Sequence, residues 1–242
     1  MHSPIRAPIP VETLLLAYRS GIFPMADTRE DLDIFWVEPR DRAIFPLNGL
    51  RISKSLRKTV RSDRFHVTLD RAFEEVIRAC AAPRPGHPES WISDRIIATY
   101  LELHRAGYAH SVECWIEDDD GAHELVGGLY GVAFDQVFCG ESMFSFVSDA
   151  SKVALCWLVA MMREAGYLIL DCQFMTDHLA SLGAREIPQR DYLALLETAR
   201  GKPCSTLAQA YQNFTDISRD DANGLPHSSP GKLIAQSLTQ TS

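Results

Sequence analysis

Three polar side chains occur inside apolar stretches in the second half of the chain. Asp171 and Gln173 lie two residues apart in the apolar run 167–174, and Glu141 follows Gly140 in another such run. Residues two apart in a strand face the same side, so Asp171 and Gln173 are predicted to share a face. A carboxylate there needs a hydrogen-bond donor, such as a neighbouring amide N–H. An amide oriented in this way could accept a hydrogen bond from an attacking amine through its carbonyl oxygen.

Each of these residues also has a purely structural interpretation. Asp171 could satisfy backbone groups at the end of a strand, and Glu141 could form a buried ion pair with Lys152. The glycines at positions 127, 128, 131 and 140 permit either the close approach of a ligand or a tight packing contact. The residue types alone leave both interpretations open.

The segment 51–64 concentrates positive charge in a chain whose formal net charge is −8. At helical spacing Lys54, Lys58 and Arg61 share one face, and apolar residues occupy the other. A solvated helix face is the ordinary interpretation of such a pattern. The negative total argues against a protein that coats nucleic acid by bulk attraction, but it is compatible with a local phosphate-binding patch.

Periodicity and turn signals predict the elements that hold these residues. We expect helices at 11–20, 51–64, 71–81, 94–106, 150–165 and near 191–200, and strands at 34–37, 65–69, 110–117, 124–134, 137–145 and 167–174. Asp70 is expected to cap the helix at 71–81. Loops are expected at 22–24, 83–88 and 118–121, and the polar chain beyond about 212 is expected to be loose, with 232–235 docking as a short strand. The strand and helix order predicts an α+β (mixed α/β) fold with a central sheet.

Composition limits the class of protein. With 242 residues, of which 46% are hydrophobic and 23% charged, the chain is typical of a globular protein of one or two domains. Six cysteines show no CxxC pair or metal-ligand spacing, and those at 114, 139, 156 and 172 are expected to be buried thiols in a reducing compartment. No stretch has the length of a signal peptide core or a membrane span, so we expect a cytoplasmic location, no membrane partner and no metal.

A series of short motifs occurs in order between about residues 12 and 200. They are Gly21–Pro24, Trp91–Ile92, Glu124–Val132, Gly140–Ser145, Ala150–Lys152, Asp171–Gln173 and Ser181–Ala184. Together they resemble the bacterial leucyl/phenylalanyl-tRNA–protein transferases, and several linked motifs in register are far more specific than any one of them.

This resemblance implies a fold and an activity. The fold would have a small N-terminal domain at 1–40, a domain similar to the N-acetyltransferase (GNAT) fold with a central, mostly antiparallel sheet at 41–205, and a polar C-terminal tail at 206–242. The family moves Leu or Phe (Met less well) from aminoacyl-tRNA to the α-amine of proteins that begin with Arg or Lys, which marks them for N-degron proteolysis. It uses no metal or acetyl-CoA, so no cofactor is expected, and we expect a monomer.

The resemblance also implies roles for individual residues. Asp171 and Gln173 would be the catalytic pair, and Glu141 would contact the aminoacyl-adenosine end. The other expected site residues are Trp91 and Tyr100 at the adenosine and aminoacyl site, Leu129, Phe138 and Leu158 in the side-chain pocket, and Lys54, Lys58 and Arg61 in the tRNA-binding cluster. Met25 and Leu158 replace bulkier aromatic residues of some family members, which leaves the preference of the pocket open.

Two other functions are compatible with parts of the sequence. An acetyl-CoA-dependent N-acetyltransferase would bind pyrophosphate with a glycine-rich loop, but the matching segment Phe146–Ser151 lacks glycine and carries Asp149. A non-enzymatic RNA-binding module built on the basic helix would leave Glu141 and its companions without a purpose. The aminoacyltransferase is therefore the expected function.

Overall fold

The central element of the fold is a mixed β-sheet. The computed structural model describes residues 7–31, 33–83, 90–117, 120–216 and 228–239. Within them the sheet has the strand order β4-β5-β6-β7-β8-β3-β9. Its strands are β3 (Asp41–Phe45), β4 (His66–Leu69), β5 (Ala109–Glu117), β6 (His123–Phe134), β7 (Val137–Ser145), β8 (Ile169–Gln173) and β9 (Arg185–Pro188). Neighbouring strands are antiparallel except β7 and β8. The predicted α+β fold with a mostly antiparallel sheet is confirmed.

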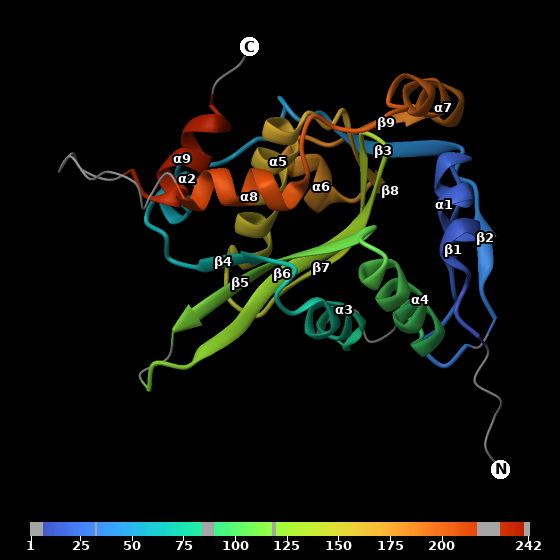
Figure 1. The fold of residues 1–242 in the computed structure, drawn as a ribbon, viewed down its shortest axis with the longest axis horizontal. Coiled ribbons are helices and arrows are strands. Elements are labelled where there is room, and N and C mark those ends of the chain that lie inside the picture. Colours follow the sequence, from blue (N-terminus) through green and yellow to red (C-terminus); the bar gives the residue numbers. More distant parts are fainter. Residues whose placement is uncertain (1–6, 32, 84–89, 118–119, 217–227, 240–242) are drawn as a thin grey trace.

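Helices cover both faces of this sheet (Figure 1). One face carries α2 (Lys54–Arg61), α5 (Ala150–Ala165), α6 (Asp177–Leu182), α8 (Leu207–Asp216) and α9 (Pro230–Ser237). On the other lie α3 (Phe73–Ala81) and α4 (Asp94–Arg105), while α7 (Gln189–Thr198) lies near β9. A small N-terminal region beside α4 consists of α1 (Val11–Arg19) and a two-stranded sheet of β1 (Phe23–Met25) and β2 (Phe35–Val37). No helix in the described part of the chain combines the length and apolarity needed to cross a membrane.

Local sequence explains where the main helices begin and end. Ser53 begins α2, because its hydroxyl oxygen accepts a hydrogen bond of 3.1 Å from the Leu56 N–H. Gly166 ends α5 in the left-handed conformation at φ 79°, which glycine adopts without a steric penalty. Nearly all of α5 is buried, apart from Lys152, Arg163 and Glu164, so this helix forms the centre of one core.

Several short elements differ from the sequence prediction. Residues 22–24 were expected to be a loop, but 23–25 form β1, and the short elements β3, α6 and β9 were not predicted. Asp70 does not cap a helix; with φ at 59° it accepts a hydrogen bond from the Ser111 N–H, and α3 begins only at Phe73. Most of the loop predicted at 83–88, and part of the turn at 118–121, lie outside the described residues. The missed strands contain three to five residues, too few for their periodicity to be recognised.

The C-terminal segment is more ordered than predicted where the structure describes it. Helix α8 continues to Asp216, and the segment expected to dock as a strand docks as α9. Ser229 and Pro230 favour a helix start there, and Ile234 and Ala235 are buried. The Gly231 N–H donates a 2.7 Å hydrogen bond to the Asp63 carboxylate, which joins α9 to the end of α2. The predicted loose residues at 217–227 lie outside the described part.

Candidate functional site

A cavity lies where β7 and β8 separate. The two strands pair only from Val137↔Ile169 to Cys139↔Asp171, and β7 then continues without β8 beside it. The space between them is a cavity of about 300 Å³. Its lining is mainly apolar: Phe23, Met25, Trp91, Leu129, Met143, Leu155, Leu158, Leu170, Phe174 and Leu179. A concave apolar site with a few polar groups is typical of small-ligand pockets, and this one fits an apolar side chain.

Glu141 reaches this cavity because of a β-bulge. Gly131 pairs with Gly140 and Tyr130 pairs with Ser142, so Glu141 is an extra residue in β7 that has no partner in β6. Bulges change the direction in which a side chain points and are common beside active sites. The Glu141 carboxylate lines the cavity and accepts hydrogen bonds from Tyr18 at 2.7 Å and Tyr100 at 3.0 Å.

The environment of Glu141 places its proton equilibrium near neutral pH. Burial raises the pKa of Glu141 to about 7, although the hydrogen bonds from Tyr18 and Tyr100 oppose that rise. Burial and the nearby Glu141 charge also raise the pKa of both tyrosines, so they remain protonated donors. A carboxyl group with a pKa near 7 can accept or return a proton during a reaction. The structural alternative of an ion pair between Glu141 and Lys152 is not found, and Lys152 instead pairs with Asp149 at 3.1 Å.

Asp171 lies behind the cavity in a buried polar cluster. Its carboxylate accepts two hydrogen bonds from Arg42, at 2.8 Å from Nε and 2.5 Å from Nη2, and a third at 3.0 Å from the Tyr192 hydroxyl. Both charged side chains have an exposed fraction of 0%, so each depends on the other for its charge to be balanced. Asp171 is absent from the cavity wall.

Gln173 donates hydrogen bonds to both carboxylates, Asp171 and Glu141. Its backbone is left-handed, with φ at 56°, and its N–H donates a 2.9 Å hydrogen bond to Asp171 Oδ1. Its side-chain Nε2 donates to Glu141 Oε1 at 3.3 Å. Left-handed backbone in a residue other than glycine is strained and is frequent at functional sites. With Nε2 facing Glu141, the carbonyl oxygen Oε1 is the acceptor that Gln173 has left for a ligand in the cavity.

The prediction that Asp171 and Gln173 share a face is wrong. Leu170 and Cys172, which the alternation had placed on the far side, line the cavity, whereas Asp171 points to the opposite side. Gln173 reaches the cavity because its positive φ ends the alternation of the strand. Asp171 therefore orients the backbone of Gln173, and Glu141 orients its side-chain amide.

The remaining predicted pocket residues divide into two groups. Trp91, Leu129 and Leu158 line the cavity, as does Met25. Tyr100 is fully buried behind Glu141, and Phe138 is fully buried in the core, where its ring lies 2.4 Å from the position of a Cβ on Gly131. Neither Tyr100 nor Phe138 is part of the cavity wall.

The four cysteines that were predicted to be buried differ in their exposure. Those at 114, 139 and 156 are buried free thiols, which confirms the prediction for them. Cys172 is only half-buried and faces the cavity, so the prediction of a buried thiol is wrong there.

The basic residues Lys54, Lys58 and Arg61 lie outside the cavity. All three are exposed on α2, whose buried residues are Leu56 and Val60. The predicted helix with one basic and one apolar face is therefore present. Their exposure makes them available to a large charged ligand.

The polar partners of the two carboxylates were missed from the sequence, namely Tyr18, Arg42 and Tyr192, as were several apolar residues of the cavity wall such as Phe23 and Met143. Among the three polar residues, only Arg42 could have been noticed in the sequence, because it is a charged residue next to the apolar run 43–45. The strand β3 that holds it was not predicted. Tyr18 and Tyr192 lie on α1 and α7 and reach the site only through tertiary packing.

The family models and the similar proteins with known names agree on one family. Two family models match: "Leucyl/phenylalanyl-tRNA protein transferase" at residues 44–197 and the N-terminal domain of the same name at residues 8–40. A leucyl/phenylalanyl-tRNA–protein transferase of Novosphingobium aromaticivorans is 54% identical over 97% of both chains. One from Rhizorhabdus wittichii is 57% identical over 78% of this chain and 75% of its own. Among solved structures, FemX matches with a TM-score of 0.50 at 10% identity, over 84% of this chain and 70% of FemX, which shows a similar fold only.

Proposed function

The chain belongs to the leucyl/phenylalanyl-tRNA protein transferase family, and we propose that it transfers Leu or Phe, and Met less well, from aminoacyl-tRNA to a protein. The acceptor is the N-terminal α-amine of a protein that begins with Arg or Lys, which marks that protein for N-degron proteolysis. The observation that carries this proposal is the apolar cavity of about 300 Å³ with the Glu141–Gln173 pair in its wall.

The reaction needs alignment more than activation. The amine nitrogen attacks the ester carbonyl carbon, a C–N bond forms, the bond to the ribose 3′ oxygen breaks, and that oxygen receives the proton. The ester is already activated, so no covalent enzyme intermediate is required. An α-amine has a pKa of about 8, which leaves a usable neutral fraction at pH 7. Holding amine and ester in place can contribute about 7–11 kcal/mol.

Two side chains of the cavity wall are assigned to proton handling. Gln173 Oε1 accepts a hydrogen bond from the attacking amine and directs its lone pair at the carbonyl carbon. Glu141, with a pKa raised to about 7, can take the proton that the amine loses and pass it to the leaving oxygen. Its negative form also favours an acceptor whose first side chain is a cation.

Asp171 acts in this scheme as a positioning residue. It accepts a hydrogen bond from the backbone N–H of Gln173 and so stabilises the left-handed backbone of that residue. Arg42 and Tyr192 in turn donate hydrogen bonds to Asp171. Leu129, Leu158 and Trp91 surround the donor side chain. An apolar pocket discriminates one methylene by only about 1–3 kcal/mol, so several apolar donors are expected.

The basic face of α2 is the proposed contact with the body of the tRNA. Lys54, Lys58 and Arg61 are exposed on one side of this helix, in a chain with a net charge of −8. A local concentration of cations in an acidic protein is the pattern that a polyanion selects. Neutralising all three is expected to weaken binding and flatten its dependence on salt.

The finer description of the molecule belongs to the same proposal. A GNAT-like domain at 41–205 is supported by the parallel strands β7 and β8, which separate around the cavity. The N-terminal domain would occupy 1–40 and the C-terminal segment 206–242. A cytoplasmic location fits the free cysteines, since none of the six is in a disulfide, and a monomer remains part of the proposal.

The acetyl-CoA alternative is less favoured by the local geometry. The position where a pyrophosphate would meet the start of α5 carries Asp149, whose φ is 71° and whose carboxylate pairs with Lys152. An acid at the N-terminus of a helix repels a second anion there. We therefore retain a single proposed function.

The test mixes labelled leucyl-tRNA with a peptide that begins with Arg. We expect label on the peptide, and none after RNase treatment or with a peptide whose α-amine is acetylated. A parallel reaction replaces leucyl-tRNA with labelled acetyl-CoA. Label from acetyl-CoA but not from leucyl-tRNA would overturn the proposal.

A further inference from the structure

The chain leaves the wall of the cavity through a tight turn. Gln173 has φ at 56°, and across it the Phe174 N–H donates a 2.7 Å hydrogen bond to the Cys172 carbonyl oxygen. A turn of three residues with a positive φ at its centre is rare and strained. It ends the strand β8 and brings the side chain of Phe174 to the same cavity that Gln173 lines.

Phe174 is the exposed aromatic residue of this cavity. Phe23 is buried and Trp91 is half-buried, whereas 46% of Phe174 is exposed to solvent. A large apolar side chain that faces water gains free energy when a ligand covers it. Because the ring both lines the cavity and faces solvent, it lies at the rim, where a ligand in the cavity meets the outside.

The ring of Phe174 is held in place by Phe23. The two rings contact edge to face, with centroids 5.6 Å apart and an angle of 77° between their planes, which is an attractive arrangement. Phe23 is in turn covered by the guanidinium of Arg42, which lies 4.8 Å from its centroid and pairs with Asp171. Phe23 therefore already carries a cation on its ring. Of the two rings, Phe174 is the one that remains for a ligand.

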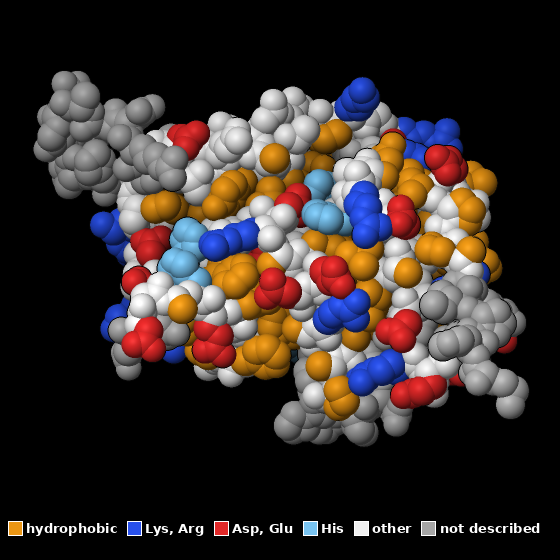
Figure 2. All heavy atoms as spheres, turned by 60° about the horizontal axis from the view of Figure 1, so that its bottom comes forward, with side chains coloured by type: hydrophobic (Ala, Val, Ile, Leu, Met, Phe, Trp, Pro, Cys, Tyr) orange, Lys and Arg blue, Asp and Glu red, His pale blue; other side chains and the backbone are white. Residues whose placement is uncertain are grey.

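The charges of the cavity wall favour a cation at this rim. Among the described residues that line the cavity, none is Lys or Arg, and the one acid is Glu141. Its carboxylate already accepts hydrogen bonds from Tyr18, Tyr100 and Gln173. The surface around α3 and α4 differs, because Lys and Arg side chains are mixed there with Asp and Glu (Figure 2). A cationic side chain at the rim therefore meets no Lys or Arg of the wall, and the acid of the wall is already engaged by three donors.

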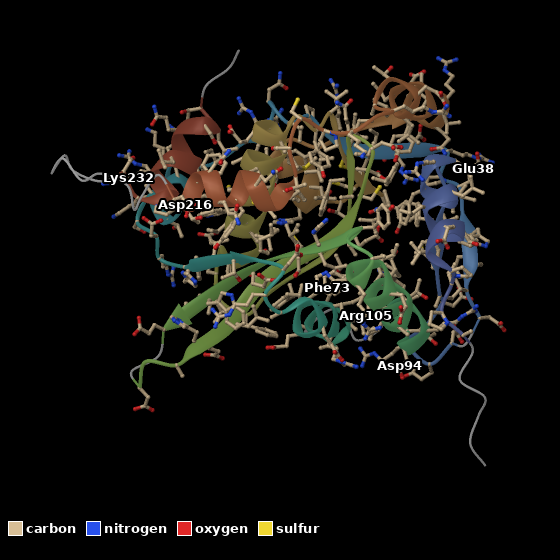
Figure 3. All side chains as sticks on the ribbon, in the orientation of Figure 1. Glu38, Phe73, Asp94, Arg105, Asp216 and Lys232 are labelled. Carbon is tan, nitrogen blue, oxygen red and sulfur yellow. The ribbon has the colours of Figure 1, made fainter. Side chains whose placement is uncertain are left out.

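Other acidic side chains lie on the outer surface of the molecule. Glu38, Asp94 and Asp216 are all exposed, and Figure 3 shows them on three separate parts of the fold. None of the three lines the cavity. Their attraction for a charged ligand passes through solvent, where salt screens it over about 8 Å at physiological ionic strength. Selection of a cationic side chain at the cavity therefore needs a group at the rim itself.

We propose that the ring of Phe174 binds the positively charged first side chain of the acceptor protein. The inference rests on the proposed function, in which the α-amine of the acceptor lies at Gln173 Oε1. The first side chain starts one carbon away from that amine, so it reaches the ring of the next residue in the chain. A guanidinium or ammonium group within about 6 Å of a ring centroid is attracted to the face of the ring. The apolar stem of Arg or Lys also covers ring surface that otherwise faces water.

The test uses acceptor peptides that begin with Arg or with citrulline, which has a similar shape without the charge. Leucyl-tRNA is the donor at a saturating concentration, and kcat/KM is measured for each peptide. In Phe174→Leu, kcat/KM with the Arg peptide should fall about two- to fivefold, which corresponds to an exposed contact between a cation and a ring. The citrulline peptide should react about as well as with the wild type, because Leu still provides an apolar surface. Phe174→Tyr keeps the ring and should keep the wild-type ratio of the two peptides.

Phe146→Leu is the matched control. It makes the same change at a ring that is 63% exposed and outside the cavity wall, so the ratio of the Arg to the citrulline peptide should stay that of the wild type. Equal losses with both peptides in Phe174→Leu would overturn the proposal, because they would indicate that the ring only supports the turn at Gln173. A higher KM for leucyl-tRNA with an unchanged peptide ratio would also overturn it, because the ring would then contact the donor.

Failure of the proposed function gives a different result. Binding of the two peptides to the protein is also measured by calorimetry without any donor. A wild-type protein that prefers the Arg peptide, loses this preference in Phe174→Leu and transfers no leucine would refute the transferase and leave the ring contact supported. Transfer by Phe174→Leu with the wild-type ratio of the two peptides would refute the ring contact and leave the transferase supported.

Discussion

At the scale of single residues, the chemistry depends on how Glu141 is surrounded. The bulge in β7 turns its carboxylate toward the cavity, two tyrosines donate to it, and Gln173 Nε2 faces it at 3.3 Å. None of these neighbours is a cation, so burial dominates and raises the pKa of Glu141 to about 7. A carboxylate paired with an arginine would instead stay ionised through the whole neutral range.

This raised pKa predicts a specific pH profile. Below pH 7 both Glu141 and the acceptor amine are protonated, so the logarithm of kcat/KM should rise with a slope of about 2, falling to about 1 between pH 7 and 8. In Glu141→Gln the slope should be about 1 below pH 8, because only the amine still titrates. Transfer to an Arg peptide from pH 5.5 to 9 measures both.

Tyr100→Phe is the matched control for this profile. It removes a hydrogen bond that lowers the pKa of Glu141, so the steep limb should move to higher pH without losing its slope. A Glu141→Gln enzyme with the same slope as the wild type would remove Glu141 from the proton transfer.

At the scale of elements, a buried polar cluster around Asp171 joins β3, β8 and α7 at the site. Arg42 of β3 and Tyr192 of α7 both donate to Asp171 of β8. The cluster also acts on the cavity, because the backbone N–H of the strained residue Gln173 donates a further hydrogen bond to Asp171. Packing of β3 and α7 against β8 is thereby coupled to the position of the amide in the cavity.

Removing the charge of Asp171 should therefore destabilise the fold. Asp171→Asn leaves Arg42 buried without a counter-charge, which is expected to cost about 3–5 kcal/mol of unfolding free energy. Urea unfolding followed by circular dichroism measures this loss. Stability equal to that of the wild type would contradict the assigned pairing.

Tyr192→Phe separates the positioning role of Asp171 from folding. It removes one of several hydrogen bonds to Asp171, so a cost of about 1 kcal/mol is expected. Because Gln173 would be held less firmly, kcat should fall while the KM for leucyl-tRNA changes little. A change in KM alone would argue against positioning.

At the scale of the whole molecule, the C-terminal segment supports the basic side. Helix α9 packs on α2 through Gly231, whose N–H donates a hydrogen bond to Asp63 at the end of α2. The basic helix thus has the sheet-covering helix α5 on one side and the end of the chain on another (Figure 1). Docking of α9 links the last part of the chain to the proposed RNA-binding surface.

Gly231→Ala tests this link. A Cβ there would come 1.9 Å from the Val60 carbonyl oxygen, a backbone atom that cannot move alone, so α9 should be displaced at a cost of about 1–3 kcal/mol. We expect faster proteolytic removal of the last residues and weaker tRNA binding. Gln236→Ala, an exposed change on the same helix, should alter neither. Unchanged proteolysis of Gly231→Ala would show that α9 is not held by this contact.

The sequence alone determined the elements whose signals are local. The basic helix within 51–64, the apolar helix that ends at Gly166 and the three strands between 110 and 145 were all predictable, because periodicity and capping depend on neighbouring residues. The exact start of the basic helix at Ser53 came only from the structure. Linked motifs also identified the family, together with Glu141 and Gln173 as residues that meet at one cavity.

The tertiary structure alone decided how those residues are used. Arg42 lies 129 positions from Asp171, and Tyr18 lies 123 positions from Glu141, so no local pattern announces either pair. The bulge at Glu141 depends on the register of two strands, and the left-handed backbone of Gln173 on an acceptor supplied by Asp171. Such choices depend on packing between distant segments, which settles the direction of a side chain after local propensity has settled its element.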